Sequence, residues 1–335
     1  YDYTNAQAGN YAWHTILHEI GHALGLKHGH ESQNGFAALP SEYDSLEYSV
    51  MTYRSYQGSD IARYSYSEWS APQSYMIADI AALQRMYGAD YTTNRGDTVY
   101  SWDQDSGDTR VNGRIGIDAG GSVIFATIWD GGGNDTYDLS SYETDLQINL
   151  RPGKCSLFDE AQLAYLGADT YASGSIYNAL RYNGDSRSLI ENAMGGSGAD
   201  TLIGNQVNNR LWGGDGADRL IGAKGNDRLM GEAGDDILQG GAGQDHLRGG
   251  EGNDVLTGGS DGDVFLFTGL MGSDVITDFA DGVDKLYFDL SFQQVLTGAE
   301  QVGDDVGMGG DEIAVAEEKA PGIDDAFGGH EKAGF

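Results

Sequence analysis

The sequence predicts an α+β region over residues 1–90, followed by an all-β region over residues 91–335 that contains a parallel β-roll. Three observations predict this fold class. A histidine motif near residue 18 lies within an apolar stripe of helical spacing, short apolar β runs replace helical patterns after Tyr91, and eight glycine-rich nonapeptides follow one another without a gap over residues 195–266. We therefore predict two domains with a boundary near Tyr91.

Composition and charge limit the partners and the sources of stability. The chain of 335 residues has a formal net charge of −33, which disfavours nucleic acid and anionic membranes as partners. No apolar run approaches the roughly 18 residues that span a bilayer, so we expect no membrane insertion. The single cysteine, Cys155, excludes an internal disulfide, and bound metal ions are the expected source of stability. The N-terminus has neither an initiator Met nor a signal sequence, so we expect a fragment or a processed product.

The motif H-E-x-x-H-x-x-G-x-x-H begins at His18 and predicts a catalytic zinc site. On a helix, His18 and His22 lie about 40° apart around the axis and can hold one Zn²⁺ together. Glu19 is expected to project beside the metal rather than at it. This is the position expected of a general base for a zinc-bound water molecule. Gly25 can end the helix in a left-handed conformation and so return His28 as a third ligand. Three protein ligands leave the fourth position open, as in catalytic zinc sites.

A helix is expected over residues 12–24 around this motif. Its apolar stripe consists of Trp13, Ile16, Leu17, Ile20 and Leu24. His14 lies four residues before His18 on the same face, and we interpret it as a partner or bystander because the set of three ligands is already complete. His30 follows the ligand set in a polar loop and is expected to face solvent.

A second helix is expected over residues 72–87, with Pro72 in its first turn and a glycine directly after its end. Short β runs follow at residues 122–129 and 146–150. This change from helical to β patterns is the basis for the predicted domain boundary.

The segment S-V-M-T-Y at residues 49–53 is interpreted together with the histidine motif before it. Together they resemble the metzincin clan of zinc endopeptidases, and within it the serralysin family of secreted bacterial alkaline metalloproteases. The resemblance implies that residues 1–90 are the C-terminal part of a metzincin catalytic domain. It also implies that Met51 forms an apolar floor beneath the zinc histidines, and that Tyr53 points its hydroxyl at the metal as a catalytic residue beside Glu19. The alternative for Tyr53 is a buried structural tyrosine.

A single copy of a Gly/Asp repeat at residues 130–138 is preceded by a G-D-T loop at residues 96–98. Serralysins carry similar segments that hold calcium, so the resemblance implies a calcium site here. The implied ligands are Gly96, Thr98, Asp130, Gly132 and Asp135. Glu191 matches a further calcium ligand of the family beside the repeat array, while Leu189 stands where the family has a threonine.

Residues 195–266 follow the template G-G-x-G-x-D-x-U-x, which is the calcium-binding RTX repeat. Six turn residues offer hard oxygen ligands, and three strand residues point the apolar eighth position inward. Two nonapeptides complete one coil, so residues 18 apart stack, and without calcium the stacked carboxylates repel and the array should be disordered. The predicted calcium ligands of the array are Asp200, Asp218, Asp227, Asp236, Asp245, Asp254 and Asp263. The second repeat has Asn209 at the sixth position, so we expect a weak or missing ion there.

Two further β runs, at residues 274–279 and 285–288, are expected to cap the roll. The acidic, glycine-rich tail from about residue 298 is expected to be mobile. Serralysins end in an apolar export signal, which residues 333–335 match poorly, so the expectation of export rests on the family resemblance alone.

The resemblance implies a secreted, extracellular bacterial endopeptidase with one catalytic Zn²⁺ and several structural Ca²⁺ ions. In this hypothesis a water molecule deprotonated with the help of Glu19 attacks a peptide carbonyl polarised by zinc, and Tyr53 stabilises the oxyanion. The expected partners are protein or peptide substrates, a proteinaceous inhibitor and a type I secretion apparatus, and we expect a monomer. The alternative is a calcium-binding RTX module with a vestigial or incomplete protease site, because the family's upper cleft wall precedes the zinc helix and is expected to be missing.

Overall fold

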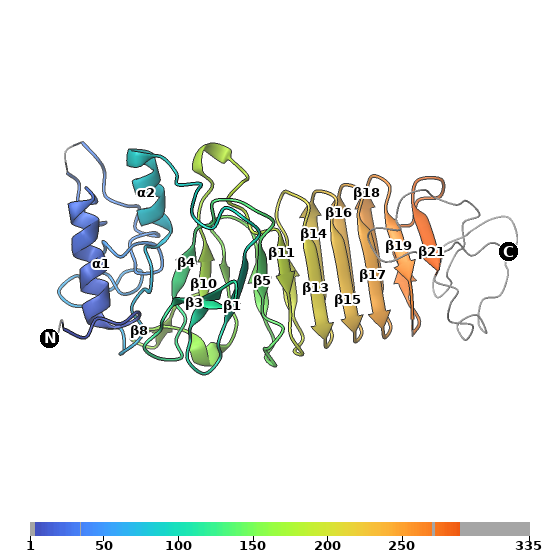
Figure 1. The fold of residues 1–335 in the computed structure, drawn as a ribbon, viewed down its shortest axis with the longest axis horizontal. Helices are drawn as coiled ribbons and strands as arrows, with labels where there is room; N and C mark the ends of the chain where they lie inside the picture. Colours follow the sequence, from blue (N-terminus) through green and yellow to red (C-terminus); the bar gives the residue numbers. More distant parts are fainter. Residues whose placement is uncertain (1–3, 34, 270–271, 289–335) are drawn as a thin grey trace, which may run out of the picture. The chain divides into compact units, whose positions relative to one another are not determined.

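The computed structural model describes residues 4–33, 35–269 and 272–288 (Figure 1). The chain forms two compact units: Tyr1–Leu139 with Gln147–Ile190, and Ser140–Leu146 with Glu191–Phe335. The tail predicted to be mobile lies outside the described residues. The boundary predicted near Tyr91 falls within the first unit, and as a domain boundary it stays a prediction.

Helix α1 (Tyr11–Ala23) carries the first two motif histidines. Asn10 is the N-cap residue, and its side-chain oxygen accepts a hydrogen bond from the Trp13 N–H at 2.8 Å. The helix ends in a turn in which Gly25 takes φ +93°, and the Leu26 N–H donates back to the Gly21 carbonyl at 2.9 Å. The predicted role of Gly25 as a left-handed stop is therefore confirmed.

Helix α2 (Ile77–Tyr87) begins five residues later than the sequence predicted. Residues 72–75 lie outside the helix, because the backbone N–H of Gln73 donates to the Phe125 carbonyl and its side-chain amide donates to the Val123 carbonyl, both at 2.8 Å. The placement of Pro72 in the first turn is therefore wrong, and Met76 occupies the position that precedes the helix. Neither helix of the described residues combines the length and apolar character that crossing a bilayer requires.

The β structure of the first unit consists of short strands. Their bounds are β1 (Val99–Trp102), β2 (Thr109–Val111), β3 (Arg114–Ile117), β4 (Ala126–Ile128), β5 (Thr136–Asp138), β6 (Gln147–Asn149), β7 (Cys155–Ser156), β8 (Tyr165–Gly167), β9 (Thr170–Tyr171) and β10 (Ile176–Asn178), with 3-10 turns η1 (Glu160–Gln162) and η2 (Tyr182–Gly184). Strand β1 pairs with β2 and β5, β2 also pairs with β3, β10 pairs with β4 and β7, and β8 pairs with β9. Both β runs predicted over residues 122–129 and 146–150 contain a strand, each shorter than expected.

One apolar core joins the histidine-bearing part of the first unit to its strands. Val50, Met51 and Met76 pack in the same buried cluster as Phe125 and Tyr177. The helical segments before Tyr91 therefore bury their apolar side chains against the β segments that follow it. This shared core explains why the two predicted regions meet within a single compact unit.

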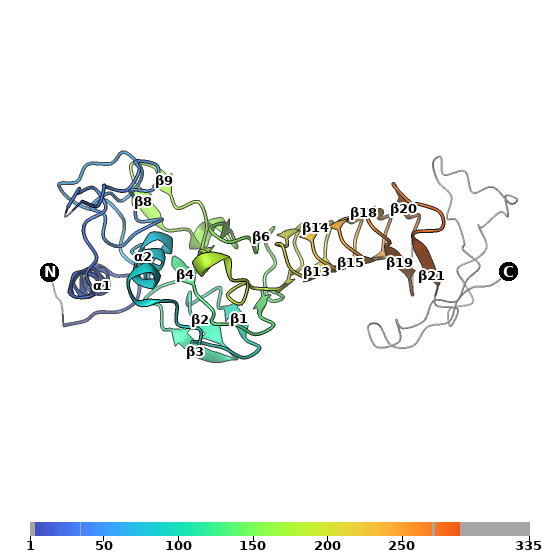
Figure 2. The same cartoon turned by 90° about the horizontal axis from the view of Figure 1, so that it is seen from above.

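The second unit is the predicted parallel β-roll (Figures 1 and 2). Its strands are β11 (Asn192–Met194), β12 (Thr201–Ile203), β13 (Arg210–Asp215), β14 (Arg219–Lys224), β15 (Arg228–Ala233), β16 (Ile237–Ala242), β17 (His246–Glu251), β18 (Val255–Ser260), β19 (Val264–Phe267), β20 (Val275–Ile276) and β21 (Lys285–Phe288). Odd-numbered strands pair in parallel with one another from β11 to β21, and even-numbered strands do so from β12 to β20.

The register of the roll matches the predicted repeat of two nonapeptides per coil. Leu211, Leu229 and Leu247 are direct partners across successive strands, each 18 residues after the last. None of the apolar side chains at the eighth position of the template is exposed to solvent. The inward-facing leucine ladder is thus confirmed, and β20 and β21 extend the two sheets as the sequence predicted.

Candidate metal centres

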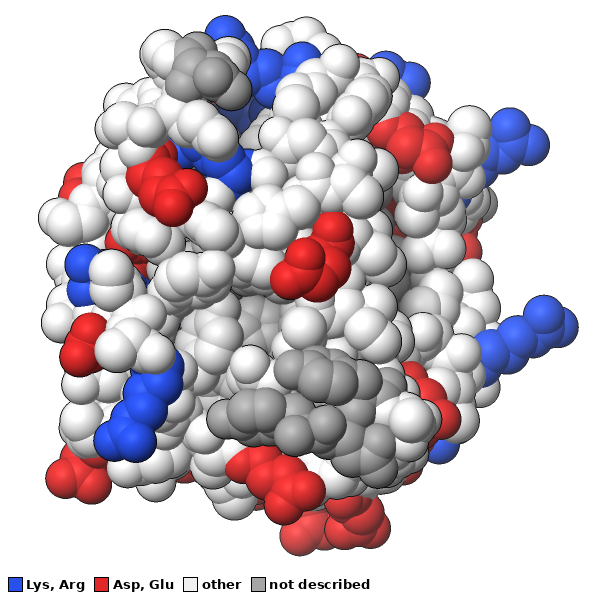
Figure 3. Space-filling model, turned by 90° about the vertical axis from the view of Figure 1, so that its left-hand side faces the viewer, with Lys and Arg blue, Asp and Glu red and all other residues white. Residues whose placement is uncertain are grey.

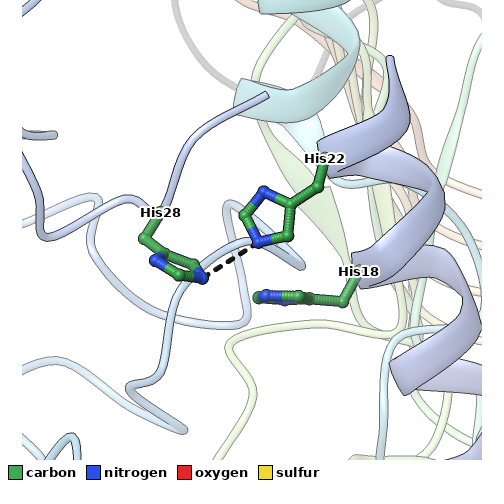
Figure 4. Close-up of side chains that lie close together, drawn as sticks. All are labelled: His18, His22 and His28. Atoms are coloured by element: carbon green, nitrogen blue, oxygen red, sulfur yellow. Dashed lines mark hydrogen bonds between the residues drawn. The ribbon is translucent and has the colours of Figure 1, made fainter. Parts of the chain in front are cut away.

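The three motif histidines converge on one point (Figure 4). Helix α1 places His18 and His22 one turn apart, and the turn at Gly25 returns His28 beside them. The Nε2 atoms of His22 and His28 are 3.0 Å apart, and one ring nitrogen from each histidine lies within 4.8 Å of the others. Ligands of a tetrahedral zinc ion lie about 3.3 Å from one another, so these nitrogens can surround an ion of that size.

The other ring nitrogen of each histidine faces an acceptor. His18 Nδ1 lies 2.8 Å from the Val50 carbonyl, and His22 Nδ1 lies 3.0 Å from the Leu26 carbonyl. His28 Nδ1 faces a carboxylate oxygen of Glu31 at 3.2 Å. A carbonyl oxygen only accepts hydrogen bonds, so Nδ1 carries the proton in His18 and His22, and Nε2 keeps its lone pair for a metal. The negative charge of Glu31 beside His28 Nδ1 favours the same proton position in His28. This chemistry fits a divalent ion at the convergence point.

Asp79 holds the segment that orients His18. Its buried carboxylate accepts hydrogen bonds from Ser49 Oγ at 2.6 Å, from the Val50 N–H at 2.8 Å and from the Met76 N–H at 3.0 Å. The Val50 carbonyl in turn accepts from His18. Burial raises the pKa of Asp79 to about 6. Sequence reasoning missed this residue, because two of its three partners are about thirty residues away and its local pattern is that of a helix start.

Met51 lies against the face of α1 between the two helical histidines. It is 1% exposed, and a side chain added at Gly21 would collide with its sulfur atom. The glycine of the motif therefore permits the close approach of Met51 to the helix. This position agrees with the apolar floor that the family resemblance implies.

His14 is a hydrogen-bond partner of the same turn. Its Nε2 lies 3.2 Å from the Val50 carbonyl, and its Nδ1 lies 2.9 Å from the Tyr66 hydroxyl. Burial lowers the pKa of His14 to about 4, so the ring is neutral at physiological pH. His14 thus supports the Val50 carbonyl and stays outside the converging set.

Tyr53 and Glu19 flank the three histidines. The Tyr53 hydroxyl lies 2.9 Å from His28 Nε2, and its ring stacks on His18 with a centroid separation of 5.6 Å. Burial, followed by the charges of Glu31 and Glu19, raises the pKa of Tyr53, which keeps the phenol protonated and able to donate. The Glu19 side chain is exposed on the next position of the helix.

A pocket of about 1080 Å³ opens beside Tyr53 in the first unit. Its wall includes Tyr11, Arg63, Tyr64 and Tyr66. Aromatic walls with a few polar groups are typical of sites that bind organic ligands. The pocket therefore offers room for a peptide side chain next to the histidines.

Replacement of Asp79 by alanine is expected to destabilise the first unit by about 3–5 kcal/mol, because three buried donors lose a charged acceptor. Metal affinity at the histidines should also fall about 10–100-fold, since the carbonyl that orients His18 loses its support. Thermal unfolding and metal titration measure the two effects. Asp118→Ala removes an exposed carboxylate from the same unit and is the matched control. Equal stability and metal affinity in the two variants would contradict the role of Asp79.

The oxygens predicted for the first calcium site lie together in the first unit. Thr98 Oγ1 donates to the Gly96 carbonyl at 2.8 Å, and the Thr98 N–H donates to Asp135 Oδ1 at 2.8 Å. The Asp130 carboxylate accepts the Gly132 N–H at 2.7 Å, and both aspartates are buried. Buried carboxylates among convergent carbonyls are typical of calcium sites.

Glu191 belongs to the second unit. Its carbonyl accepts the Arg210 N–H at 3.2 Å and the Asn209 side-chain amide at 2.9 Å. The structure therefore places the Glu191 backbone in the repeat array.

The repeat carboxylates have buried oxygen atoms without hydrogen-bond partners. One carboxylate oxygen, Oδ1, accepts the N–H of the residue 18 positions earlier, as in the 2.8 Å bond from Asp218 to Asp236. The other oxygen, Oδ2, is buried and makes no hydrogen bond in Asp218, Asp227, Asp236, Asp245, Asp254 and Asp263. A side chain added at Gly231 would collide with Asp236 Oδ2 and the Gly249 carbonyl, so these oxygens border a confined space. Such a cradle fits Ca²⁺, which prefers carboxylate and carbonyl oxygens.

Burial raises the pKa of each repeat carboxylate. The pKa rises to about 8 for Asp236, to about 7 for Asp218 and Asp227, and to about 6 for Asp245 and Asp254. Like-charged neighbours in the stack add to the rise for Asp218 and Asp236. Ionised carboxylates are therefore unstable in this roll unless a cation neutralises them.

Two repeat positions differ from the other six. Asp200 is buried, but its oxygens accept the Leu146 N–H at 2.8 Å and the Gly196 N–H at 2.7 Å. Asn209 replaces the carboxylate by an amide, whose nitrogen donates to the Glu191 carbonyl. This amide N–H₂ group binds a carbonyl oxygen that a cation could otherwise bind. The contact supports the expectation of a weak or missing ion in the second repeat.

Known protein families match the two β regions. Residues 89–164 match the family model of the peptidase M10 serralysin C-terminal domain. Residues 194–229 and 230–265 match the RTX calcium-binding nonapeptide repeat. The first match covers the site around Asp130. The second covers the repeat aspartates whose Oδ2 atoms make no hydrogen bond.

Curated relatives support the same family. The chain is 35% identical over 216 residues to metalloprotease AprA of Pseudomonas entomophila (strain L48), covering 62% of this chain and 40% of that protein. It is also 35% identical over 214 residues to serralysin of Proteus mirabilis, covering 62% and 38%, and 35% identical over 204 residues to serralysin G of Dickeya chrysanthemi, covering 59% and 37%. The chain thus spans about 40% of the length of these relatives or less.

These matches first define a calcium-binding protein built on RTX repeats. More specifically, residues 89–164 are similar to the C-terminal domain of serralysins, which agrees with the resemblance that the sequence predicted.

Proposed function

We propose that this chain is part of a secreted, calcium-stabilised zinc endopeptidase. The observation that carries the proposal is the convergence of three histidine Nε2 atoms whose Nδ1 atoms all face acceptors. His18, His22 and His28 would hold the zinc ion, and a fourth position would stay open. When bound, zinc supplies Lewis acidity to a peptide carbonyl at that position.

The flanking residues supply the proton chemistry. Glu19 follows His18 on α1 and carries a charge close enough to influence both His18 and Tyr53. It would take a proton from the attacking water and pass it to the leaving amine. Tyr53, kept as a neutral phenol, would donate a hydrogen bond to the oxyanion of the substrate. The pocket beside Tyr53 would accept a neighbouring side chain of the peptide.

The remaining partners follow from the family and the charge of the chain. The relatives named metalloprotease and serralysin support extracellular protein or peptide substrates. A proteinaceous inhibitor and a type I secretion apparatus are proposed by the same analogy. We also propose a monomer. The net charge of −33 disfavours nucleic acid as a partner. Several Ca²⁺ ions would occupy the site around Asp130 and the repeat cradles.

A second candidate function is a calcium-binding RTX module whose protease site is incomplete. The observation that favours it is the outward face of α1, where Ile16, Ile20 and Leu24 are exposed by 39%, 46% and 36%. The surrounding face of the first unit carries mostly uncharged side chains (Figure 3). An apolar helix face of this kind normally packs against further protein. These side chains were predicted to form an apolar stripe with Trp13 and Leu17, which are only half-buried.

Glu19→Ala is expected to abolish hydrolysis of casein while one equivalent of zinc stays bound, because general-base catalysis contributes roughly 10²–10⁴-fold. Hydrolysis and zinc content are measured on the same calcium-loaded preparation. Glu42→Ala, which removes an exposed carboxylate of the same unit, is the matched control.

Undiminished hydrolysis by Glu19→Ala would overturn the mechanism. A parent chain that binds zinc and calcium but shows no hydrolysis above a chelated control would favour the RTX module instead.

A further inference from the structure

A second group of metal-ligating side chains lies next to the converging histidines. His28, His30 and Glu31 each place one ligand atom within 4.8 Å of the other two. The Glu31 carboxylate lies between the two rings: one oxygen faces His28 Nδ1 at 3.2 Å, and the other lies 3.9 Å from His30 Nε2. The two histidines therefore share one carboxylate.

The position of His30 is set by packing. Its ring stacks on His28 with a centroid separation of 5.5 Å and an interplanar angle of 9°, and it also contacts the Tyr53 ring at 5.1 Å. The side chain is only 17% exposed, so the prediction that it faces solvent is wrong. Its Nδ1 is buried without a hydrogen-bond partner. Stacking in this loop holds the ring next to the first metal centre and leaves its Nε2 directed toward Glu31.

We propose that His30 Nε2 and Glu31 form a second, weaker site for zinc or a similar divalent ion. Imidazole and carboxylate are both common zinc ligands, and water would complete the coordination. Two ligands of a tetrahedral zinc ion are about 3.3 Å apart. The present 3.9 Å closes to that value by rotation of the Glu31 side chain, which is 47% exposed.

The shared carboxylate couples the two centres. One oxygen of Glu31 lies 3.2 Å from His28 Nδ1, so its negative charge increases the basicity of a ligand of the first centre. An ion bound to the other oxygen of Glu31 withdraws negative charge from that carboxylate. It also adds a cation beside Tyr53, whose ring contacts both His28 and His30. Occupancy of the second site should therefore weaken the first centre and inhibit any hydrolysis there, a consequence that rests on the proposed function.

Metal titration of the full calcium-loaded chain tests the binding. The probes are Co²⁺, followed by its visible absorption, and Zn²⁺, followed by calorimetry. The parent chain should bind one equivalent tightly and a second more weakly. His30→Ala, and the more conservative His30→Gln, should lose the second equivalent and keep the first. Glu31→Gln should lose the second equivalent and also bind the first about 10–100-fold more weakly.

Two further variants make the result decisive. His22→Ala should lose the tight equivalent and keep the weak one, whereas Glu42→Gln should keep both. A single equivalent in the parent chain, or a weak equivalent that persists in both His30 variants, would overturn the proposal and leave a surface ion pair with adventitious binding.

Hydrolytic activity provides a separate test. If the parent chain hydrolyses casein, zinc beyond the first equivalent should inhibit this hydrolysis. The rate of the His30→Ala variant should stay at the value that this variant shows with one equivalent of zinc. Absence of hydrolysis in every sample would count against the proposed function and would leave the binding result to decide the second site.

Discussion

Removal of calcium is expected to unfold the repeat array over residues 195–266. Six buried carboxylate oxygens make no hydrogen bond in the folded roll, and burial opposes the charge on each of these side chains. A buried charge without a partner costs several kcal/mol, whereas a whole domain is stabilised by only about 5–15 kcal/mol. The uncompensated charges therefore outweigh the leucine ladder at neutral pH. Far-UV circular dichroism and hydrogen exchange of the strand amides, with and without a chelator, measure the change.

A matched pair of substitutions tests whether the orphaned oxygens are the cause. Asp236→Asn and Asp215→Asn remove the same charge, but Asp236 is buried with an unpartnered oxygen and Asp215 is exposed. Loss of one calcium site costs about 2.7 kcal/mol when free calcium is 100 times the Kd of that site. We expect this loss for Asp236→Asn and almost none for Asp215→Asn. A roll that keeps its strands in chelator, or equal effects of the two substitutions, would contradict the prediction.

The repeat array could be predicted from sequence because its structure is periodic. Each nonapeptide repeats the same local choice of turn glycines and inward leucine, so the pairing of Leu211 with Leu229 follows from a count of residues. The histidine centre was predictable for a similar reason. Helical spacing relates His18 to His22, and a single glycine turn relates both to His28.

The supports of the histidine centre could not be predicted, because they come from distant parts of the chain. Asp79 contacts Val50 from the start of another helix, and no local pattern connects the two residues. The late start of α2 has the same origin, since Gln73 bonds to the segment before β4, about fifty residues further along. His30 was assigned to solvent from the polarity of its loop, but stacking on His28 overrides that polarity. Tertiary contacts of this kind have no signal in a single sequence.

Acidification is expected to stabilise the calcium-free roll and so to lower the calcium concentration that folds the repeat array. The folded roll holds the pKa of its carboxylates at about 6 to about 8, above the ordinary 3.8. Without calcium, the folded state therefore binds more protons than the unfolded state between about pH 4 and pH 8. This stabilisation is fully present below that window and is lost as the pH rises through the folded pKa values. In chelator, lowering the pH from about 8 to about 5 should thus restore part of the strand signal.

With calcium present, protons compete with the ion only in the folded roll, because Ca²⁺ binds the ionised carboxylate. The unfolded array has carboxylates of ordinary pKa that are ionised above about pH 5, so folding with calcium displaces few protons there, and acidification shifts the calcium midpoint only by stabilising the empty roll. Circular dichroism titrations at several pH values measure both the midpoint and the calcium-free baseline. Asp236, with the highest pKa of the stack, should make the largest contribution near neutral pH, so Asp236→Asn should flatten the pH dependence of the calcium-free strand signal there and Asp215→Asn should not. A calcium midpoint that rises on acidification, or a calcium-free strand signal that stays constant between about pH 8 and pH 5, would contradict the raised pKa values that burial gives these side chains.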